Sequence, residues 1–461
     1  MEGWGGGSFR NVLDQSVAPY LWRPWYDRVA TPAVARLFFP LSRAWAAAVA
    51  AQGDPVVFHA IADSGPPRRM VGEKLLNAVT RSWREYEETL DEWEAALYGG
   101  EGPSEALNGL ERRRLSLSRK VMALRAGFLP AHLERPFPAI HFDIETADRV
   151  EARHGARLAS PDGMMRPTDA PEIRRSRSFL RDGAVWHWAR FKTPDGAASP
   201  PAEARIREPA GTVPRGTMVF AHGIGMETEM WGEEGTIPDW FLAQGFRVIE
   251  PQGPWHTRRR LDGRYGGEPI FAHGPGGLLD YSWLHVRELG AWIAHARSLD
   301  ADRNVVAPGP VLLSGISLGA LTAMQVLSWA RHWRAESRPD YALLIAPAAS
   351  LVEVAYHGSL TGSMGVPLAL EQAGWTEETA GRWSPLLDAA TDPAIDPDRI
   401  GIVLGDVDEI TPYASGEDLV RRWAVPARNV WTRNQGHFTV SLGLTSAPEP
   451  LHRFVEMMTI R

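Results

Sequence analysis

The chain has 461 residues, a formal net charge of −7, 44% apolar residues and 23% charged residues, which is the balance of an ordinary folded globular protein. Its length accommodates two or three average domains, or one α/β domain with large additions. Lysine and arginine are scattered rather than clustered, which gives nucleic-acid binding no electrostatic support. The absence of cysteine excludes disulfides, thiolate metal sites and a cysteine nucleophile.

The beginning of the chain predicts a cytoplasmic protein. Residues 1–10 are rich in glycine and lack the charged start and the apolar run of a secretory signal. The most apolar early stretch, residues 36–51, is interrupted by Pro40 and Arg43 and is too short to cross a bilayer. We therefore expect no transmembrane helix in this part of the chain.

Residues 1–172 are predicted to form an N-terminal helical region. At 75–97 apolar residues recur at three- and four-residue spacing between charged ones, and residues 105–124 read as a second helix. Glycines and a proline at positions 99–103 end the first helix before the second begins. We expect the two helices to form a hairpin.

Residues 173–461 differ in character and predict an α/β domain. Residues 178–192 predict strand structure around an Asp182-Gly183 turn, whereas residues 194–214, rich in Pro, Ala and Gly, predict an exposed loop. Short apolar runs then alternate with helix-like segments, which is typical of a mostly parallel, doubly wound sheet with helices on both faces. These runs lie at 217–221, 246–249, 311–313, 342–345 and 400–404.

One connection between the expected strands is unusually long. Residues 349–398 exceed the length of a normal link between two strands of a compact domain. Long connections of this kind often cover a binding site as lids. We therefore expect this stretch to be a cap inserted into the α/β domain.

The strongest motif is VLLSGISLGA at 311–320, in which an apolar run leads into Gly315-Ile316-Ser317-Leu318-Gly319 and then into a helix-like segment. This is the G-x-S-x-G pattern of a nucleophile elbow, a strained turn between a strand and a helix where glycines let neighbouring backbone pass. The alternative is a glycine-serine turn without chemistry. The chain holds one such pentapeptide, and it lies where an elbow requires it. We predict Ser317 to be the nucleophile.

Four short motifs follow one another along the chain: HGIG at 222–225, GISLGA at 315–320, GDVDEITP at 405–412 and NQGH at 434–437. Together they resemble an α/β-hydrolase of the esterase and lipase kind over about residues 176–461. The resemblance implies a parallel sheet of roughly eight strands, an acyl-enzyme intermediate and no cofactor. The residues before this stretch have no counterpart in the minimal fold of that family.

A serine hydroxyl needs a base to take its proton, and the chain has 14 histidines. In the family that the motifs resemble, the catalytic residues follow in the order serine, acid, histidine. Four histidines follow Ser317, namely His332, His357, His437 and His452. His437 lies in a loop after an expected strand at 429–432, where a side chain can reach over the sheet. We predict His437 to be the general base; the alternative is a loop histidine without a function.

The acid is expected at the end of the strand before that histidine. The strand at 400–404 leads into three carboxylates, those of Asp406, Asp408 and Glu409. One of them is needed to orient the imidazole and to stabilise the imidazolium. We predict Asp408, with Asp406 as the alternative, because the run resembles the hydrolase pattern G-x-x-D followed by a proline turn.

Two backbone N–H groups are expected to stabilise the tetrahedral oxyanion. One is that of Leu318, directly after the nucleophile, and the other is that of Ile224 or Gly225, in a loop that resembles the HG motif of lipases and esterases. His-Gly pairs also occur at His154, His273 and His357, but only His222 follows an apolar strand ahead of the elbow. We expect His222 itself to be structural.

A further loop, PQGPWHTRRR at 251–260, is expected on the catalytic edge of the sheet. Trp255, His256 and Arg258 are the candidate substrate-binding residues, which would shape the pocket or hold a carboxylate. The alternative is a solvated basic turn, because three consecutive arginines cannot all face one cleft. No HExxH, Walker A or complete GxGxxG sequence occurs, so we predict no metal and no nucleotide cofactor.

The predicted function is hydrolysis of a small-molecule or lipid-like carboxylic ester through an acyl-enzyme on Ser317. An amidase, a peptidase or an acyltransferase uses the same triad, and a non-catalytic protein of this fold that binds a ligand is a further alternative. No nucleic-acid partner is expected. The 19 tryptophans are expected to fill a large core. Peripheral membrane contact through the N-terminal helices and oligomerisation stay open.

Overall fold

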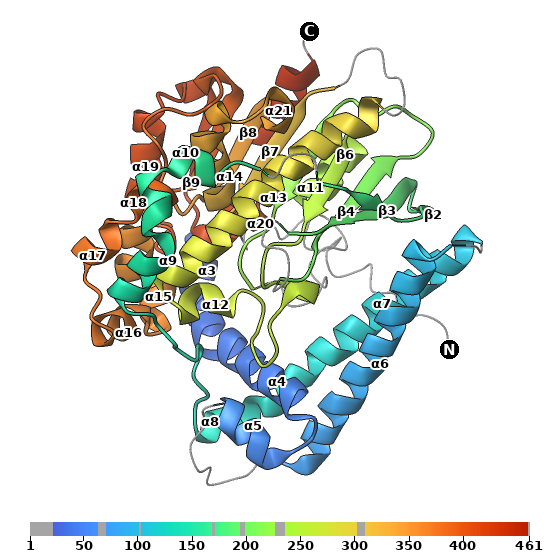
Figure 1. Ribbon diagram of the computed structural model, residues 1–461, viewed down its shortest axis with the longest axis vertical. Helices are drawn as coiled ribbons and strands as arrows, with labels where there is room; N and C mark the ends of the chain where they lie inside the picture. The colour runs from blue at the N-terminus through green and yellow to red at the C-terminus, as the bar shows by residue number, and fades with distance from the viewer. Residues whose placement is uncertain are drawn as a thin grey trace.

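A single mixed sheet runs through the molecule (Figure 1). The computed structural model describes residues 22–62, 71–100, 103–167, 171–193, 199–225, 236–301 and 309–459. Within these ranges ten strands pair in the order β1-β3-β4-β6-β5-β7-β8-β9-β10, and β2 also pairs with β3. The strands are β1 (Arg174–Arg175), β2 (Phe179–Arg181), β3 (Ala184–Phe191), β4 (Ala202–Pro209), β5 (Thr217–Ala221), β6 (Arg247–Pro251), β7 (Val311–Ile316), β8 (Tyr341–Ile345), β9 (Ile400–Gly405) and β10 (Val430–Arg433).

The directions of the strands identify the fold. From β6 through β5, β7, β8 and β9 to β10 every neighbouring pair is parallel, whereas β4 is antiparallel to both β3 and β6. Counted from β3, the eight strands lie in the order 1-2-4-3-5-6-7-8 with the second strand reversed. This is the arrangement of the α/β-hydrolase fold, so the predicted fold class is confirmed.

Helices cover both faces of the sheet. In β5, Met218 and Phe220 pack with α11 (Ile237–Ala243), α20 (His437–Leu442) and α21 (Glu449–Thr459), while Val219 and Ala221 pack with α13 (Pro275–Ala301) and α14 (Leu318–Trp329). Successive side chains of a strand point to opposite faces, so both faces of β5 are buried. This double burial explains why the parallel strands appear in the sequence as unbroken apolar runs.

The strands overlap every apolar run that predicted one, and the predicted turn at Asp182-Gly183 joins β2 to β3. Both turn residues have positive φ angles, 50° for Asp182 and 76° for Gly183. Two left-handed residues in a two-residue loop twist the chain in the sense that a tight hairpin needs. Asp-Gly is therefore the appropriate pair at this position.

The prediction of an exposed loop at 194–214 is wrong in its centre, because β4 lies there and is buried along almost its whole length. The charged residues of β4 made it difficult to recognise as a buried strand from the sequence. Arg205 and Arg207 form ion pairs with Glu250 on β6 at 2.9 and 3.0 Å, and both guanidinium groups lie over the ring of Trp186 on β3. The charges are thus neutralised by neighbouring strands, a pairing that the local sequence does not reveal.

The N-terminal region contains the predicted helical hairpin. Helices α6 (Glu73–Tyr98) and α7 (Ser104–Ala123) pack against each other and extend away from the sheet (Figure 1). Trp93 and Leu97 of α6 and Leu107 of α7 form a small core with β2 and β3. The end of the hairpin at which α6 connects to α7 is thereby attached to the edge of the sheet.

A longer helical segment precedes the hairpin. Helix α3 (Pro24–Ala33), the π-helical turn η2 (Val34–Phe38) and α4 (Phe39–Ala51) follow one another without a break. The apolar stretch at 36–51 belongs to a longer helix than predicted, because the 28-residue helix Pro24–Ala51 is long and apolar enough to cross a bilayer. However, 61% of its apolar window is buried inside the protein, as in a core helix, so this is weak support for a membrane span. Trp45 of α4, for example, belongs to the main hydrophobic core.

The remaining elements complete the layers around the sheet. Between β8 and β9 lie η8 (Glu353–His357), α15 (Ser359–Ser363), α16 (Val366–Gln372), α17 (Glu377–Gly381) and α18 (Ser384–Leu387). The N-terminal region also holds α5 (Pro55–Ala62), η3 (Leu124–Phe128), α8 (Leu129–Glu134), α9 (Ala147–Ala159) and α10 (Pro161–Met164). The other helices are η5 (Thr257–Arg259), α12 (Glu268–Ala272), η6 (Ala330–His332), η7 (Ala335–Ser337), η9 (Pro397–Arg399), α19 (Tyr413–Arg422) and η10 (Ala427–Asn429).

Candidate active site

Ser317 occupies the sharp turn between β7 and α14. Its backbone angles are φ 55° and ψ −115°, a conformation that side-chain-bearing residues rarely adopt. A Cβ atom on Gly315 would overlap the backbone of Gly319, and a Cβ atom on Gly319 would overlap the backbone of Ala221 in β5. The two glycines therefore permit the close backbone approach that the turn requires, as the motif predicts.

The structure brings the three predicted triad residues together. His437 Nε2 lies 2.9 Å from Ser317 Oγ, and His437 Nδ1 lies 2.8 Å from Asp408 Oδ2. Ser317, Asp408 and His437 follow β7, β9 and β10, and the carboxyl ends of these parallel strands meet at one edge of the sheet. With the proton of the neutral ring on Nδ1, Asp408 accepts from that N–H and Nε2 accepts from the hydroxyl of Ser317.

Asp408 is held by the turn that contains it. Its Oδ1 accepts hydrogen bonds from the N–H groups of Ile410 and Thr411, each at 2.9 Å, and its Oδ2 accepts from the hydroxyl of Thr411 at 2.8 Å. Asp408 is only 5% exposed, whereas Asp406 and Glu409 are exposed. Of the three candidate carboxylates, the one that contacts the histidine is thus Asp408.

The environment of His437 strengthens it as a base. Burial alone disfavours the imidazolium, but the charge and the hydrogen bond of Asp408, with a smaller contribution from Asp27, outweigh burial and raise the pKa of His437 above its ordinary value. A more basic imidazole takes the proton of Ser317 more readily and is better stabilised once it is charged.

The other histidines that follow the elbow lie in different contacts. His332 is 3.3 Å from Asp162, His357 is 3.4 Å from Glu377, and the ring of His452 packs against Trp240. Of the four histidines that follow Ser317 in the sequence, His437 is therefore the one in contact with it.

The residues predicted to supply the oxyanion donors lie at the start of α14 and in the loop after β5. Leu318 is the first residue of α14, so its N–H has no partner within the helix. Ile224 lines the same cavity as Ser317 and Leu318, whereas Gly225, with φ 88°, packs under Phe38 and Phe39. These positions favour Ile224 over Gly225 as the second donor. The continuation of this loop, residues 226–235, lies outside the described residues.

His222 connects two loops through its hydrogen bonds. Its Nδ1 donates to the carbonyl of Gly223 at 2.7 Å, and its Nε2 accepts from the N–H of Gly253 at 3.0 Å. Burial is the main reason that the pKa of His222 is lowered to about 4, so the ring is neutral near pH 7. The expected structural role agrees with these contacts.

The predicted substrate-binding residues lie elsewhere. Among the described residues that line the cavity at Ser317, none of Trp255, His256 and Arg258 appears. His256 is fully buried, with Nδ1 2.8 Å from the carbonyl of Pro254, and the half-buried Trp255 packs beside Tyr281. These positions argue against contact of either residue with substrate.

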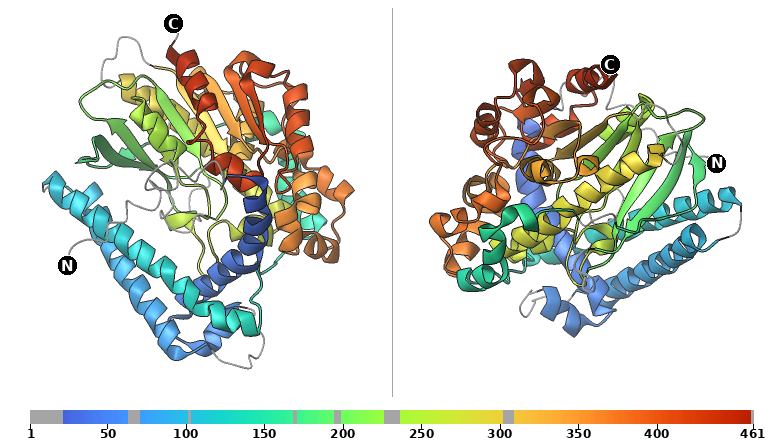
Figure 2. Two further views of the ribbon diagram at one scale, coloured as in Figure 1. Left: turned by 180° about the vertical axis from the view of Figure 1, so that it is seen from behind. Right: turned by 45° about the horizontal axis from the view of Figure 1, so that its top comes forward.

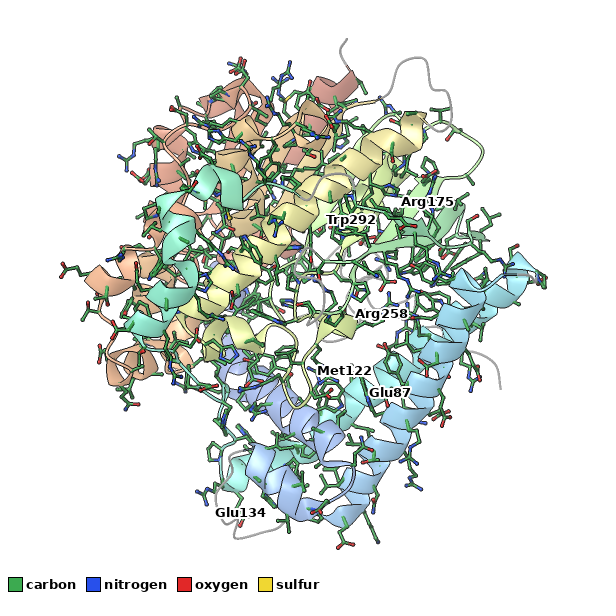
Figure 3. All side chains as sticks on the ribbon, in the orientation of Figure 1. Glu87, Met122, Glu134, Arg175, Arg258 and Trp292 are labelled. Carbon is green, nitrogen blue, oxygen red and sulfur yellow. The ribbon has the colours of Figure 1, made fainter. Side chains whose placement is uncertain are left out.

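Arg258 is held in an ion-pair cluster. It pairs with Glu94 of the hairpin at 3.1 Å and with Glu203 of β4 at 2.5 Å, and it lies over the ring of Trp93. Figure 3 labels Arg258 beside the α6–α7 hairpin. The prediction that this loop supplies a cation to the cleft is therefore corrected: Arg258 connects the α6–α7 hairpin to the sheet. The sequence around Arg258 was misleading because its partners, Glu94 and Glu203, are remote from it in the sequence.

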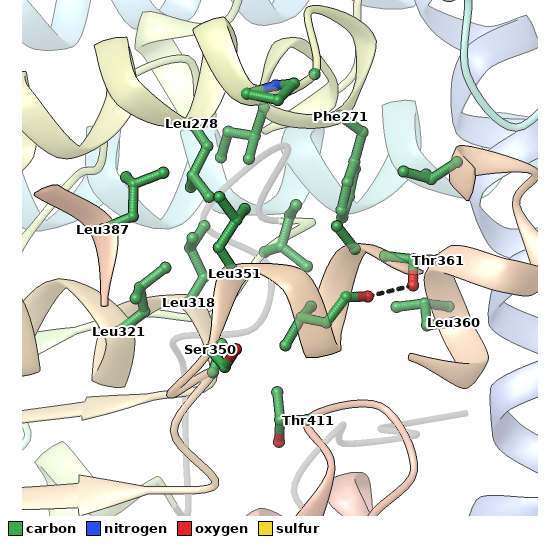
Figure 4. A pocket seen from close by; sticks show the side chains of 18 of the residues that line it. Phe271, Leu278, Leu318, Leu321, Ser350, Leu351, Leu360, Thr361, Leu387 and Thr411 are labelled. Atoms are coloured by element: carbon green, nitrogen blue, oxygen red, sulfur yellow. Dashed lines mark hydrogen bonds between the residues drawn. The ribbon is translucent and has the colours of Figure 1, made fainter. Parts of the chain in front are cut away.

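An apolar cavity of about 110 Å³ opens at Ser317 (Figure 4). Its walls come from α12, the start of α13, the start of α14 and the helices between β8 and β9. The side chains that define it are mainly aliphatic, namely Ile270, Phe271, Leu278, Leu318, Leu321, Leu351, Val354, Leu360, Val366, Leu370 and Leu387. Ser317 thus lies in the wall of a cavity whose other described walls are mainly apolar.

Two further residues belong to the site. The Thr411 hydroxyl lies 3.1 Å from His437 Nδ1, and it occurs in the GDVDEITP motif, which could have indicated it. Asp27 contacts the residues that follow His437 from 411 positions earlier in the chain, and no sequence pattern marks it. Across the described parts of the chain, no group of three or more His, Asp or Glu side chains is arranged as metal ligands.

A scan against protein-family models and a search of curated proteins give no match. Solved structures give remote similarities. An acetyl xylan esterase from Paenibacillus sp. R4 is similar with a TM-score of 0.44 and 16% identity, over 69% of this chain and 96% of that one. An acetyl xylan esterase from Thermoanaerobacterium sp. gives a TM-score of 0.38 and 13% identity, over 66% and 95% of the two chains.

A brefeldin A esterase, described as a bacterial homologue of human hormone-sensitive lipase, gives a TM-score of 0.38 and 16% identity over 70% of this chain and 86% of that chain. Similarity at this level is too low to carry an assignment of activity. The fold assignment stands on the strand order, the direction of β4 and the turn at Ser317. By these features, the chain has the α/β-hydrolase fold.

Proposed function

We propose that the chain is a serine hydrolase that cleaves carboxylic esters through an acyl-enzyme intermediate. The observation that carries the proposal is the continuous hydrogen-bonded line from Asp408 through His437 to Ser317, with Ser317 in the wall of the apolar cavity. A protein that only binds a ligand has no need of a strained serine paired with a histidine of raised pKa.

The mechanism follows from these positions. Ser317 Oγ attacks the acyl carbonyl while His437 Nε2 takes its proton, and the N–H groups of Leu318 and Ile224 donate to the oxyanion. The imidazolium then gives its proton to the leaving alcohol, which leaves the acyl group on Ser317 Oγ. Water, deprotonated by the same Nε2, attacks this acyl-enzyme and releases the carboxylic acid.

The cavity supports a substrate with an uncharged, apolar acyl group. Its described lining includes no cationic side chain, and its carboxyl group, Asp388, has a pKa that burial raises. A charged acyl chain would lose its hydration there without gaining a partner. A cavity of roughly 150 Å³ holds the six carbons of a benzene molecule, so about 110 Å³ suits an acyl chain of about four carbons.

The test is hydrolysis of p-nitrophenyl esters by the parent protein, by Ser317→Ala and by Ser298→Ala, which alters an exposed serine of α13. We expect turnover by the parent and by Ser298→Ala, and a loss of at least about a thousandfold in Ser317→Ala. Retained turnover in Ser317→Ala would refute the proposal. A parent that cleaves p-nitroanilides of the same acyl groups as fast as the esters would point to an amidase instead.

A further inference from the structure

The N-terminal segment reaches the loop that carries His437. Helix α3, dark blue in Figure 2, contacts α20, whose first residue is His437. The contact joins parts of the chain that are more than 400 positions apart, as the separation of 411 between Asp27 and Phe438 illustrates. The triad therefore lies against an element outside the sheet and its covering helices.

Asp27 forms this contact. Its Oδ1 accepts hydrogen bonds from the N–H groups of Phe438 at 2.6 Å and Thr439 at 3.4 Å, and its Oδ2 accepts from the hydroxyl of Thr439. The first N–H groups of a helix have no partner within it, so a carboxylate that accepts from them stabilises the start of the helix. Asp27 thus caps α20 from a different part of the chain, directly beside the histidine.

Gly436 permits the approach. A Cβ atom on this residue would overlap the carboxyl carbon of Asp27. The φ angle of Gly436 is −91°, which other residues adopt without strain, so the backbone conformation does not explain the glycine. The neighbouring Gln435 donates to the carbonyl of Trp22 at 3.1 Å, so two successive loop residues lie against the N-terminal segment.

The same segment also contacts the loop after β5, which contains Ile224 and Gly225. A Cβ atom on Gly225 would lie 3.5 Å from the ring of Phe38 and 3.7 Å from the ring of Phe39, at the junction of η2 and α4. One uninterrupted helical segment therefore touches the loop that carries the base and the loop that carries an expected oxyanion donor.

We infer that Asp27 is a positioning residue for His437, and that the N-terminal segment completes the active site by fixing the start of α20. The inference rests on the proposed function, in which His437 is the base. Ser317 and His437 must stay within hydrogen-bonding distance for proton transfer, and a displacement of about 1 Å can lower the rate by about a hundredfold. Asp27 acts on that distance through the backbone of α20.

Asp27 also acts on His437 electrostatically. The charged groups that act on this imidazole are Asp408 from the loop after β9 and Asp27 from α3. Both raise the pKa of His437, against the effect of burial. Removal of the Asp27 charge therefore lowers this pKa, which moves the acidic limb of kcat/KM to lower pH.

The experiment compares Asp27→Asn and Asp27→Ala with the parent. Asp27→Asn keeps the shape and an acceptor but loses the charge, so we expect the acidic limb to move to lower pH with a modest loss of kcat. Asp27→Ala removes the cap, and we expect kcat to fall by about 10- to 100-fold with little change in KM. NMR titration of the His437 ring measures its pKa without any need for turnover.

Asp54→Ala is the matched control. The Asp54 carboxylate caps α5 in the same region, accepting from the N–H groups of Val56 and Val57 at 2.7 and 3.2 Å, and makes no contact with the triad in the described structure. We expect it to leave kcat and the pH profile unchanged. A folded Asp27→Asn protein with the parent's kcat, pH profile and His437 titration would overturn the inference. A parent without esterase activity would refute the proposed function instead, and the NMR titration would still test the contact.

Discussion

Replacement of Asp408 by asparagine tests the triad at the level of individual protons. Four donors point at this carboxylate: the N–H groups of Ile410 and Thr411, the Thr411 hydroxyl and His437 Nδ1. A carboxylate accepts all four, but an amide has an NH₂ group that cannot accept. Wherever the NH₂ group of the asparagine lies, it faces at least one donor.

The backbone N–H groups cannot move, so the amide oxygen introduced by Asp408→Asn is expected to face them and the NH₂ group to face His437. The imidazole then accepts at Nδ1 and carries its proton on Nε2, where it can no longer take the proton of Ser317. A triad with the wrong tautomer loses about 10⁴-fold in kcat, which corresponds to about 5 kcal/mol.

The assay is steady-state hydrolysis of p-nitrophenyl butyrate by the parent, by Asp408→Asn and by Asp406→Asn, together with thermal unfolding. The exposed Asp406 is two positions away and does not contact His437 in the structure, so Asp406→Asn is expected to retain the parent kcat. An Asp408→Asn protein that is folded and within about tenfold of the parent kcat would refute the reasoning, because the tautomer would then not control the base.

Three further predictions concern pH, the cavity and the hairpin. Because the pKa of His437 is raised and the base acts in its neutral form, kcat/KM should fall as pH decreases, with a midpoint above that of an ordinary histidine; a midpoint below it would contradict the account. Leu278→Phe reduces the space in the cavity, so the ratio of kcat/KM for butyrate over acetate esters should fall about tenfold; an unchanged ratio would place the acyl group elsewhere. Arg258→Met leaves the carboxylates of Glu94 and Glu203 without this partner, so the free energy of unfolding should fall by about 3 kcal/mol while KM stays within about twofold; a large rise in KM would restore its role in substrate binding.

Much of the central sheet could be predicted from local sequence, because β5, β7, β8 and β9 are apolar apart from Thr217 and Ser314 and are buried on both faces. β4 could not, because Arg205 and Arg207 become acceptable in a buried strand only through Glu250 on another strand. The position of Arg258 could not be predicted for the same reason, namely that its partners lie on other elements. Its sequence neighbours suggest a solvated cation, while Glu94 and Glu203 determine its position.

The meeting of Ser317, Asp408 and His437 could be predicted because each follows a strand of one parallel sheet, and such strand ends meet at a common edge. Asp27 could not be predicted, since it comes from a helix outside the sheet and its partners are the backbone N–H groups of Phe438 and Thr439, which any sequence would provide. Backbone contacts of this kind leave little trace in the residue types involved.

Covalent labelling with a fluorophosphonate tests the central claim most directly, because the reagent reacts with a serine only where a base and an oxyanion site activate it. Peptide mapping by mass spectrometry identifies the modified residue. We expect one phosphonylated serine, at position 317, and no label in His437→Ala. A folded parent that stays unlabelled at Ser317, or that labels equally without His437, would contradict this claim.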